Sequence, residues 1–290
     1  MDITKAASFM ATHARVVDRR RFPFLTGSGD PEAVLAAVDG YRNPDGGYGW
    51  GLEPDLRAAE SQPGGALHAF EVFADVAPVT SPRAAELCDW LDSVTLPGGG
   101  LPFALPVADP AGCAPWWQGP DAGEPSLQIT SIVAATAHRV AAHDPAVAAH
   151  PWLAKATAYC LGAIDALREP PHALVLAFAV RFLDGVQGGG ELLAKLGDWI
   201  PADGRVHVAG GTEEEYMRPL DFAPFPGTPA RALLDPSVVE ADLKRLASQQ
   251  QEDGGWPVEY AGFSAQSPLE WRGMLTIRAL EILRANGHTH

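Results

Sequence analysis

A repeated glycine turn constrains the fold of this chain more than any other sequence feature. The stretch QQQEDGGWPVEY, residues 249–260, resembles YRNPDGGYGWGLEPD, residues 41–55, and both contain Asp-Gly-Gly followed by an aromatic residue. Each copy stands between two apolar segments that begin at a proline, and in both cases these prolines are 32 residues apart: Pro31 and Pro63, Pro236 and Pro268. A fixed period of this size predicts repeated pairs of helices.

Four of the predicted helices have a polar face and a strong start signal. An Asp or Ser followed by Pro caps a helix and forms its first turn. The apolar residues that follow recur at three and four positions, which is typical of helices on the outer side of a core. These outer segments start at Asp30, Ser81, Asp144 and Asp235, and the third is expected to run on through residues 146–164.

A second set of segments is apolar on most sides, which predicts buried, inner helices. They span residues 62–76, 125–140, 170–183 and 267–283. The glycine turns fall between outer and inner segments, together with the looser copies LPGGGLPF at 96–103 and PADGRVHV at 201–208. Glycine provides the positive φ of such turns. We therefore expect Trp50 and Trp256 to be packing residues at structural joints.

Charge and composition exclude several kinds of partner. A net charge of -15 argues against binding to nucleic acid or to anionic lipid, because both require clustered Lys and Arg. No apolar run approaches the roughly 20 residues that span a bilayer, and the N-terminal sequence lacks the features of a signal peptide. A cytoplasmic location is expected. The spacing of Cys88, Cys113 and Cys160 gives neither a disulfide framework nor a metal knuckle.

At the last repeat the chain resembles a known superfamily. The segment ADLKRLASQQQEDGGWPVE is similar to the repeat of the squalene and hopene cyclases, in which a Gln near a helix end precedes Gly-x-Trp, and VDGYRNPDGGYGW is a variant with Tyr41 in place of the Gln. The resemblance implies the α/α toroid of terpenoid cyclases and protein prenyltransferase β subunits. We expect a single all-α domain over residues 1–290, with five to six helix pairs and an active site in a central apolar cavity lined by inner helices.

Such a cavity predicts where substrate-contacting residues lie. A protonating cyclase needs a carboxylic acid in an apolar pocket and aromatic faces that stabilise carbocations. The family's Asp-x-Asp-Asp motif is absent, so the candidate acids are the nearest carboxylates, Glu53 and Asp55, and Asp221; a structural pairing of Asp55 with Arg57 is an equal alternative. The candidate binding residues are Gln62, His68, Trp116, Trp117, Gln128, His172, Tyr216, Phe225, Glu270 and Trp271.

No metal site is predicted. The chain has no Asp-Asp-x-x-Asp run, the acidic residues 213–215 are typical of a solvated surface, and Cys113 is better explained by packing than by zinc binding. A magnesium ion would be implied only if the substrate were a diphosphate.

Two other functions stay open. An α/α-barrel glycan hydrolase or lyase would use Trp116 and Trp117 to stack a sugar beside Asp121 and Glu124. Alternatively, the toroid binds a lipid or a protein without catalysis. If the protein is a terpenoid cyclase or prenyltransferase, its ligand is an isoprenoid or another apolar small molecule, and a partner chain or a second copy of this chain could complete the site.

Overall fold

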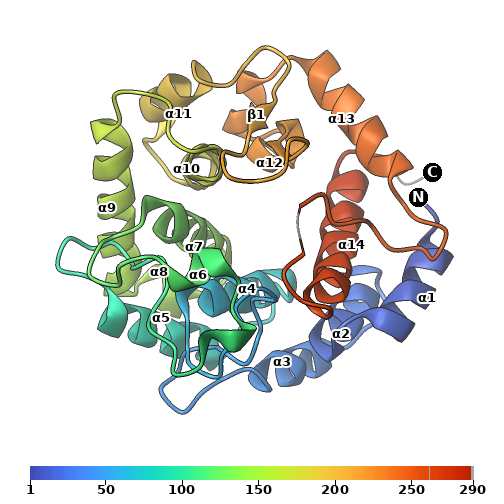
Figure 1. The fold of residues 1–290 in the computed structure, drawn as a ribbon, viewed down its shortest axis with the longest axis horizontal. Coiled ribbons are helices and arrows are strands. Elements are labelled where there is room, and N and C mark those ends of the chain that lie inside the picture. The colour runs from blue at the N-terminus through green and yellow to red at the C-terminus, as the bar shows by residue number, and fades with distance from the viewer. Residues whose placement is uncertain (261, 289–290) are drawn as a thin grey trace. The chain divides into compact units, whose positions relative to one another are not determined.

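The protein is described from a computed structural model, which describes residues 1–260 and 262–288. These residues form fourteen α-helices, two short 3-10 helices and one two-stranded sheet, which confirms the all-α class (Figure 1). None of the helices in this part of the chain is both long and apolar enough to cross a membrane. The chain divides into two compact units, and each is described by itself.

The middle unit comprises residues 30–169 with 185–187. Its helices are α3 (Pro31–Asp39), α4 (Pro63–Asp75), α5 (Pro82–Val94), α6 (Pro115–Gln118), α7 (Leu127–Ala141), α8 (Pro145–Ala148) and α9 (Pro151–Ala166), with η1 (Pro110–Gly112). Helix α4 lies against α7, and α7 also lies against α9. Helix α4 buries nine of its thirteen residues, whereas α3 buries two of nine, so the predicted distinction between inner and outer helices holds here.

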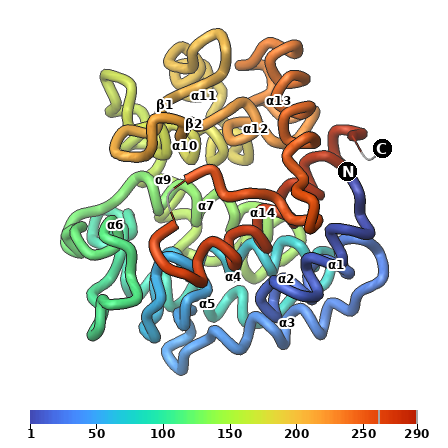
Figure 2. Tube along the Cα trace, turned by 45° about the vertical axis from the view of Figure 1, so that its right-hand side comes forward, coloured from blue at the N-terminus to red at the C-terminus, as the bar shows by residue number. Residues whose placement is uncertain are grey.

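The terminal unit comprises residues 1–29, 170–184 and 188 onward. Its elements are α1 (Ile3–His13), α2 (Val16–Leu25), α10 (Ala173–Gly185), α11 (Gly190–Gly197), β1 (Val206–His207), β2 (Tyr216–Met217), α12 (Pro219–Phe222), η2 (Pro229–Leu233), α13 (Pro236–Ser248) and α14 (Ser267–Ala285). Helix α14 lies against α1, α2 and α13. Helices from both ends of the sequence, α1 and α14, therefore belong to one unit, and Figure 2 draws them in blue and red.

The predicted helix starts are present. Asp30, Ser81, Asp144 and Asp235 each accept a hydrogen bond from the N–H two residues further on, with Pro at the next position. The third outer segment differs from the prediction, because it is broken into α8 and α9. Pro151 lacks the N–H that would continue α8, and it forms the first position of α9 instead.

One backbone turn occurs four times between these helices. Its glycine has a positive φ at each copy, 95° at Gly46, 90° at Gly99, 69° at Gly204 and 97° at Gly254. The N–H of this glycine donates to the carbonyl three residues earlier, at 3.1, 2.8, 2.7 and 2.9 Å in the same order. The two loose sequence copies are thus the same structural element as the two clear ones.

The aromatic residue that packs at the joint is the one directly after the turn. Trp256 is buried in the last copy, and the aligned position in the first copy is Tyr48, which is also buried. The prediction that Trp50 packs there is wrong, since Trp50 lies two residues further on, with 58% of its surface exposed and a φ of 55°. The glycine on either side of it lets the chain turn away from the core at this point.

Candidate functional site

The strongest candidate site lies in the middle unit, on the loop that follows the first glycine turn. A side chain at Gly49 would overlap the backbone oxygens of Ala59 and Glu60, so the loop closes tightly on itself. Its far side is anchored to η1 and α6, because the Arg57 N–H donates to the Gly112 carbonyl (3.2 Å). The Ala114 N–H likewise donates to the Asp55 carbonyl (2.8 Å).

This anchoring buries two carboxylates of the chain. Glu53 is 6% exposed and Asp55 is 3% exposed. The Asp55 N–H donates to Glu53 Oε1 at 3.0 Å, which leaves Oε2 of Glu53 directed at helix α4. Buried carboxylates require polar partners, since a charge without them would be removed from water at a high free-energy cost.

Helix α4 supplies that partner through His68. The imidazole Nε2 lies 2.8 Å from Glu53 Oε2, and Nδ1 lies 2.8 Å from Glu71 Oε2, one turn further along the helix. Glu53 and His68 are buried, whereas the Glu71 side chain is 26% exposed. Glu53, His68 and Glu71 therefore form a chain of hydrogen bonds that runs from the protein interior to a half-buried end, and we call it the Glu53 relay.

The two carboxylates keep the imidazole protonated. Burial by itself lowers the pKa of His68, but the charge of Glu71 and the hydrogen bonds to Glu53 and Glu71 more than offset burial and raise that pKa to about 9. At neutral pH the ring is an imidazolium that donates through both nitrogens. The relay thus holds a protonated imidazole between two carboxylates.

Trp117 forms an aromatic wall beside the relay. Its ring stacks on Phe103 with 4.6 Å between ring centres. A Cβ added at Gly64 would lie 3.3 Å from the Trp117 ring and 3.5 Å from Cγ of Glu53, so both side chains border the start of α4. The indole N–H of Trp117 is buried and has no hydrogen-bond partner among the described residues. The structure thereby brings together four predicted site residues: Glu53, Asp55, His68 and Trp117.

The other predicted site residues of the middle unit are Gln62, Trp116 and Gln128. Gln62 uses both ends of its amide to hold the backbone of Leu105, at 2.8 and 3.0 Å, which is a structural role. Trp116 is exposed at 46%, and Gln128 is half-buried in the first turn of α7.

The predicted residues of the terminal unit are scattered over several elements. Both carboxylate oxygens of Asp221 have structural partners, the Arg218 N–H and the Arg278 guanidinium, each at 2.8 Å. His172 is exposed at the start of α10 and contacts the Ala209 carbonyl at 3.0 Å. Trp271 lies edge-on to Tyr260 at 5.7 Å. The remaining members are half-buried: Tyr216, Phe225 and Glu270.

Potential metal ligands do not cluster in the part of the chain that the structure describes. Among residues 1–260 and 262–288, no group of three or more His, Cys, Asp or Glu side chains has an arrangement that could hold a metal ion. Cys113 packs against Leu56 and Ala58, and burial raises the pKa of its thiol. Cys113 is a packing residue in this arrangement.

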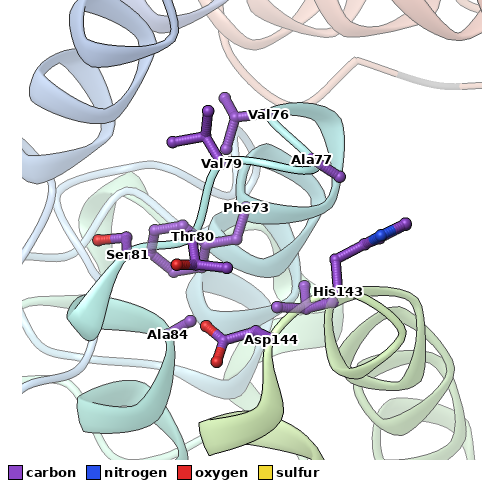
Figure 3. A pocket seen from close by; sticks show the side chains of 10 residues that line it. Phe73, Val76, Ala77, Val79, Thr80, Ser81, Ala84, His143 and Asp144 are labelled. Carbon is purple, nitrogen blue, oxygen red and sulfur yellow. The ribbon is translucent and has the colours of Figure 1, made fainter.

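Two hollows are found away from the relay. One, of about 10 Å³, has room for about a single water molecule and is enclosed by the α4–α5 and α7–α8 connections, including Phe73, Thr80 and Asp144 (Figure 3). The other is an open groove of about 750 Å³ on the terminal unit, bordered by Asp253, Tyr260 and Arg272 among others. Glu53 does not line either of them.

Sequence reasoning missed Glu71 and Phe103, which complete the relay and the aromatic wall. The spacing of His68 and Glu71, three residues apart on one helix, is a signal that could have paired them. No protein-family model matches this chain, and no curated protein matches it either.

Proposed function

We propose that this chain is a terpenoid-cyclase-like enzyme, built as an α/α toroid, in which Glu53 protonates a carbon–carbon double bond of an isoprenoid. The Glu53 relay is the observation that carries this proposal. Protonation of an alkene needs an acid whose conjugate base is stabilised at the moment the proton leaves. His68 and the Asp55 N–H offer that stabilisation to the two oxygens of Glu53.

The relay also supports a route for proton return. Glu71, at the half-buried end, can exchange protons with water and pass one to Nδ1 of His68, while Nε2 passes its own proton to Glu53. In the reaction, the π electrons of the alkene form the new C–H bond and leave a carbocation. The π electrons of a second double bond attack this cation to close the ring, and the new cation loses a proton to water to form an alkene, so the step needs no oxidant, reductant or cofactor.

Trp117 and Phe103 are suited to the cationic intermediate. The face of an aromatic ring attracts a cation, and the interaction strengthens where water is excluded. The local charge also favours a neutral hydrocarbon over a diphosphate, because two carboxylates, Glu53 and Glu71, flank one imidazolium, and a third buried carboxylate, Asp55, follows Glu53 on the same loop.

Product analysis tests this proposal. The protein is incubated with squalene, farnesyl diphosphate and geranylgeranyl diphosphate, with and without Mg²⁺, and products are identified by gas chromatography and mass spectrometry. We expect a cyclised product that Glu53→Gln and His68→Gln reduce by about a hundredfold or more, and that the exposed control Glu32→Gln leaves unchanged. Unchanged substrate in the presence of an active reference cyclase, or full activity of Glu53→Gln, would contradict the proposal.

One observation favours a second candidate, a protein that binds or cleaves glycans. Trp116 is exposed at 46%, and Asp121 and Glu124 on the following loop are exposed as well, which is the arrangement of a solvated stacking platform. This candidate predicts that soluble oligosaccharides raise the melting temperature of the protein, and that Trp116→Ala removes the shift. A shift that survives this substitution would argue against it.

A further inference from the structure

The hairpin of β1 and β2 in the terminal unit has one strongly polar face. Val206 pairs with Met217, and His207 pairs with Tyr216, in antiparallel register. Side chains alternate between the two faces of a strand, and residues directly opposite one another share a face. The next position outward is Arg205 opposite Arg218. One face of the hairpin therefore carries four side chains: Arg205, His207, Tyr216 and Arg218.

The contacts agree with this placement. The guanidinium of Arg205 lies 4.2 Å from the centre of the Tyr216 ring, and that of Arg218 lies 6.0 Å from it. The His207 ring meets the Tyr216 ring edge-on at 5.2 Å. A guanidinium that lies over an aromatic ring uses its flat face, so its N–H donors stay available in the plane. We call these four residues the arginine face.

The charge of the arginine face is unusual for this chain. Arg205 and Arg218 place two positive charges on one face at the end of the hairpin ladder, which destabilises the hairpin, in a protein whose net charge is -15. Within the described residues, neither Arg205 nor Arg218 forms a side-chain ion pair with a carboxylate. Other arginines of the same unit do so, for example Arg272 with Asp253 at 2.7 Å.

Three carboxylates close in sequence to the two arginines have other partners, and Glu213 and Glu214 of the connecting loop are exposed. Asp203 accepts the backbone N–H of Arg205 at 3.1 Å. Asp221 binds Arg278, and Glu215 accepts the Thr212 N–H at 3.3 Å. The guanidinium donors of the arginine face are thus left to an external acceptor.

We infer that the arginine face binds the phosphate group of a small molecule. Two planar guanidinium groups present paired N–H donors that match the oxygens of a phosphate, and a doubly charged anion offsets both positive charges. His207 lies on the same face, and its Nε2 donates to the Thr212 carbonyl at 3.1 Å, which fixes the ring beside Tyr216. The overall negative charge disfavours nucleic acid as the source of the phosphate.

Calorimetric titration of the full chain with inorganic phosphate and with inorganic diphosphate tests this inference. We expect saturable binding of one ion per chain at millimolar concentration or below, with Arg205→Gln and Arg218→Gln each weakening it by about tenfold or more. The matched control is Arg20→Gln, an exposed arginine on α2 of the same unit. It should bind as the unchanged protein does.

Tyr216 gives a second variant series. Tyr216→Phe keeps the ring under both guanidinium groups and should bind normally, whereas Tyr216→Leu should bind more weakly, with an unchanged circular dichroism spectrum in both cases. The inference is overturned if phosphate binding is undetectable at about 10 mM, if Arg20→Gln weakens binding as much as the other two, or if acetate binds as tightly as phosphate. None of these outcomes depends on whether the protein cyclises an isoprenoid.

Discussion

The glycine turns at Asp45 and Asp253 have the same backbone and different surroundings. In both, the N–H of the second glycine donates to the aspartate, at 2.9 Å from Gly47 and 3.1 Å from Gly255. Asp45 is then held by neutral donors, the Ser61 hydroxyl (2.8 Å) and the indole N–H of Trp90 (3.1 Å). Asp253 instead forms a two-point ion pair with Arg272, at 2.7 and 2.9 Å.

The two copies also continue differently. After Gly255 come Trp256 and Pro257, and the Trp256 N–H donates to the Thr276 hydroxyl of α14 at 3.1 Å. After Gly47 the chain passes through Gly49, Trp50 and Gly51 into the loop that carries Glu53. The turn itself is thus a structural joint, and the chemistry belongs to the segment that one copy places after it.

The largest contrast is expected between the two tryptophans. Trp256→Ala should lower the free energy of unfolding by about 3–5 kcal/mol, because a buried indole and its hydrogen bond to the Leu246 carbonyl are lost. Trp50→Ala should change it by less than about 0.5 kcal/mol, since the side chain is exposed. Urea unfolding measures both, and similar losses for the two variants would refute the distinction.

The next largest contrast is expected between the two positive-φ glycines, Gly254 and Gly46, in the stability lost when each is replaced by alanine. A Cβ at Gly254 would overlap the backbone of Lys5, so Gly254→Ala should cost at least about 3 kcal/mol in backbone strain and displaced chain. At Gly46 the nearest atom is the Glu86 carbonyl oxygen at 3.3 Å, and the cost should be about 1 kcal/mol. Equal melting temperatures of the two variants would contradict this ranking.

The glycine turn of the middle unit leads to the Glu53 relay, in which His68 titrates. Because the pKa of His68 is raised to about 9 from an unfolded value of about 6.5, its contribution to stability is complete below about pH 6.5. The contribution is lost as pH rises through about 9 and amounts to about 3 kcal/mol. Chemical unfolding between pH 6 and 10 measures it. His68→Gln should remove this dependence, and an equally steep decline in that variant would show that another group is responsible.

The smallest losses of stability are expected at the two aspartates, Asp253 and Asp45, and salt should change only the loss at Asp253. Asp253→Ala should cost about 1 kcal/mol or less at low salt, because the carboxylate is 42% exposed, and less still in about 1 M NaCl. Asp45→Ala removes hydrogen bonds to neutral donors and should cost about 1–2 kcal/mol at either salt concentration. Arg272 also holds the pKa of Asp253 below its usual value, so this ion pair is lost as pH falls through that lowered pKa. A loss at Asp45 that shrinks equally with salt would refute the distinction between neutral and charged partners.

Much of the helical architecture could be predicted from the sequence, because local signals determine it. A capping Asp or Ser before Pro fixes a helix start within a few residues, and the period of 32 residues places the joints. The division at Pro151 was missed because an apolar pattern continues across the break. The arrangement of the helix pairs as a toroid stays a prediction.

The candidate site was only half predictable. The sequence singled out Glu53, Asp55 and His68 as polar residues near an inner helix, but it could not show that His68 lies between two carboxylates. That contact depends on how the loop folds back over α4. The exposed position of Trp50 was unpredictable because it depends on a positive φ, which an aromatic residue rarely adopts.

The hydrogen bonds between Asp2 and Gln250, at 2.7 and 2.8 Å, bear on how this protein is made. A ribosome adds roughly 5–20 residues per second, so α1 waits roughly 10–50 s for the segment on which it finally rests. The middle unit, by contrast, is almost continuous in the chain and is complete by residue 187. We expect it to fold first during synthesis, while the apolar side chains of α1, Phe9 and Met10, stay exposed to chaperones until α14 emerges.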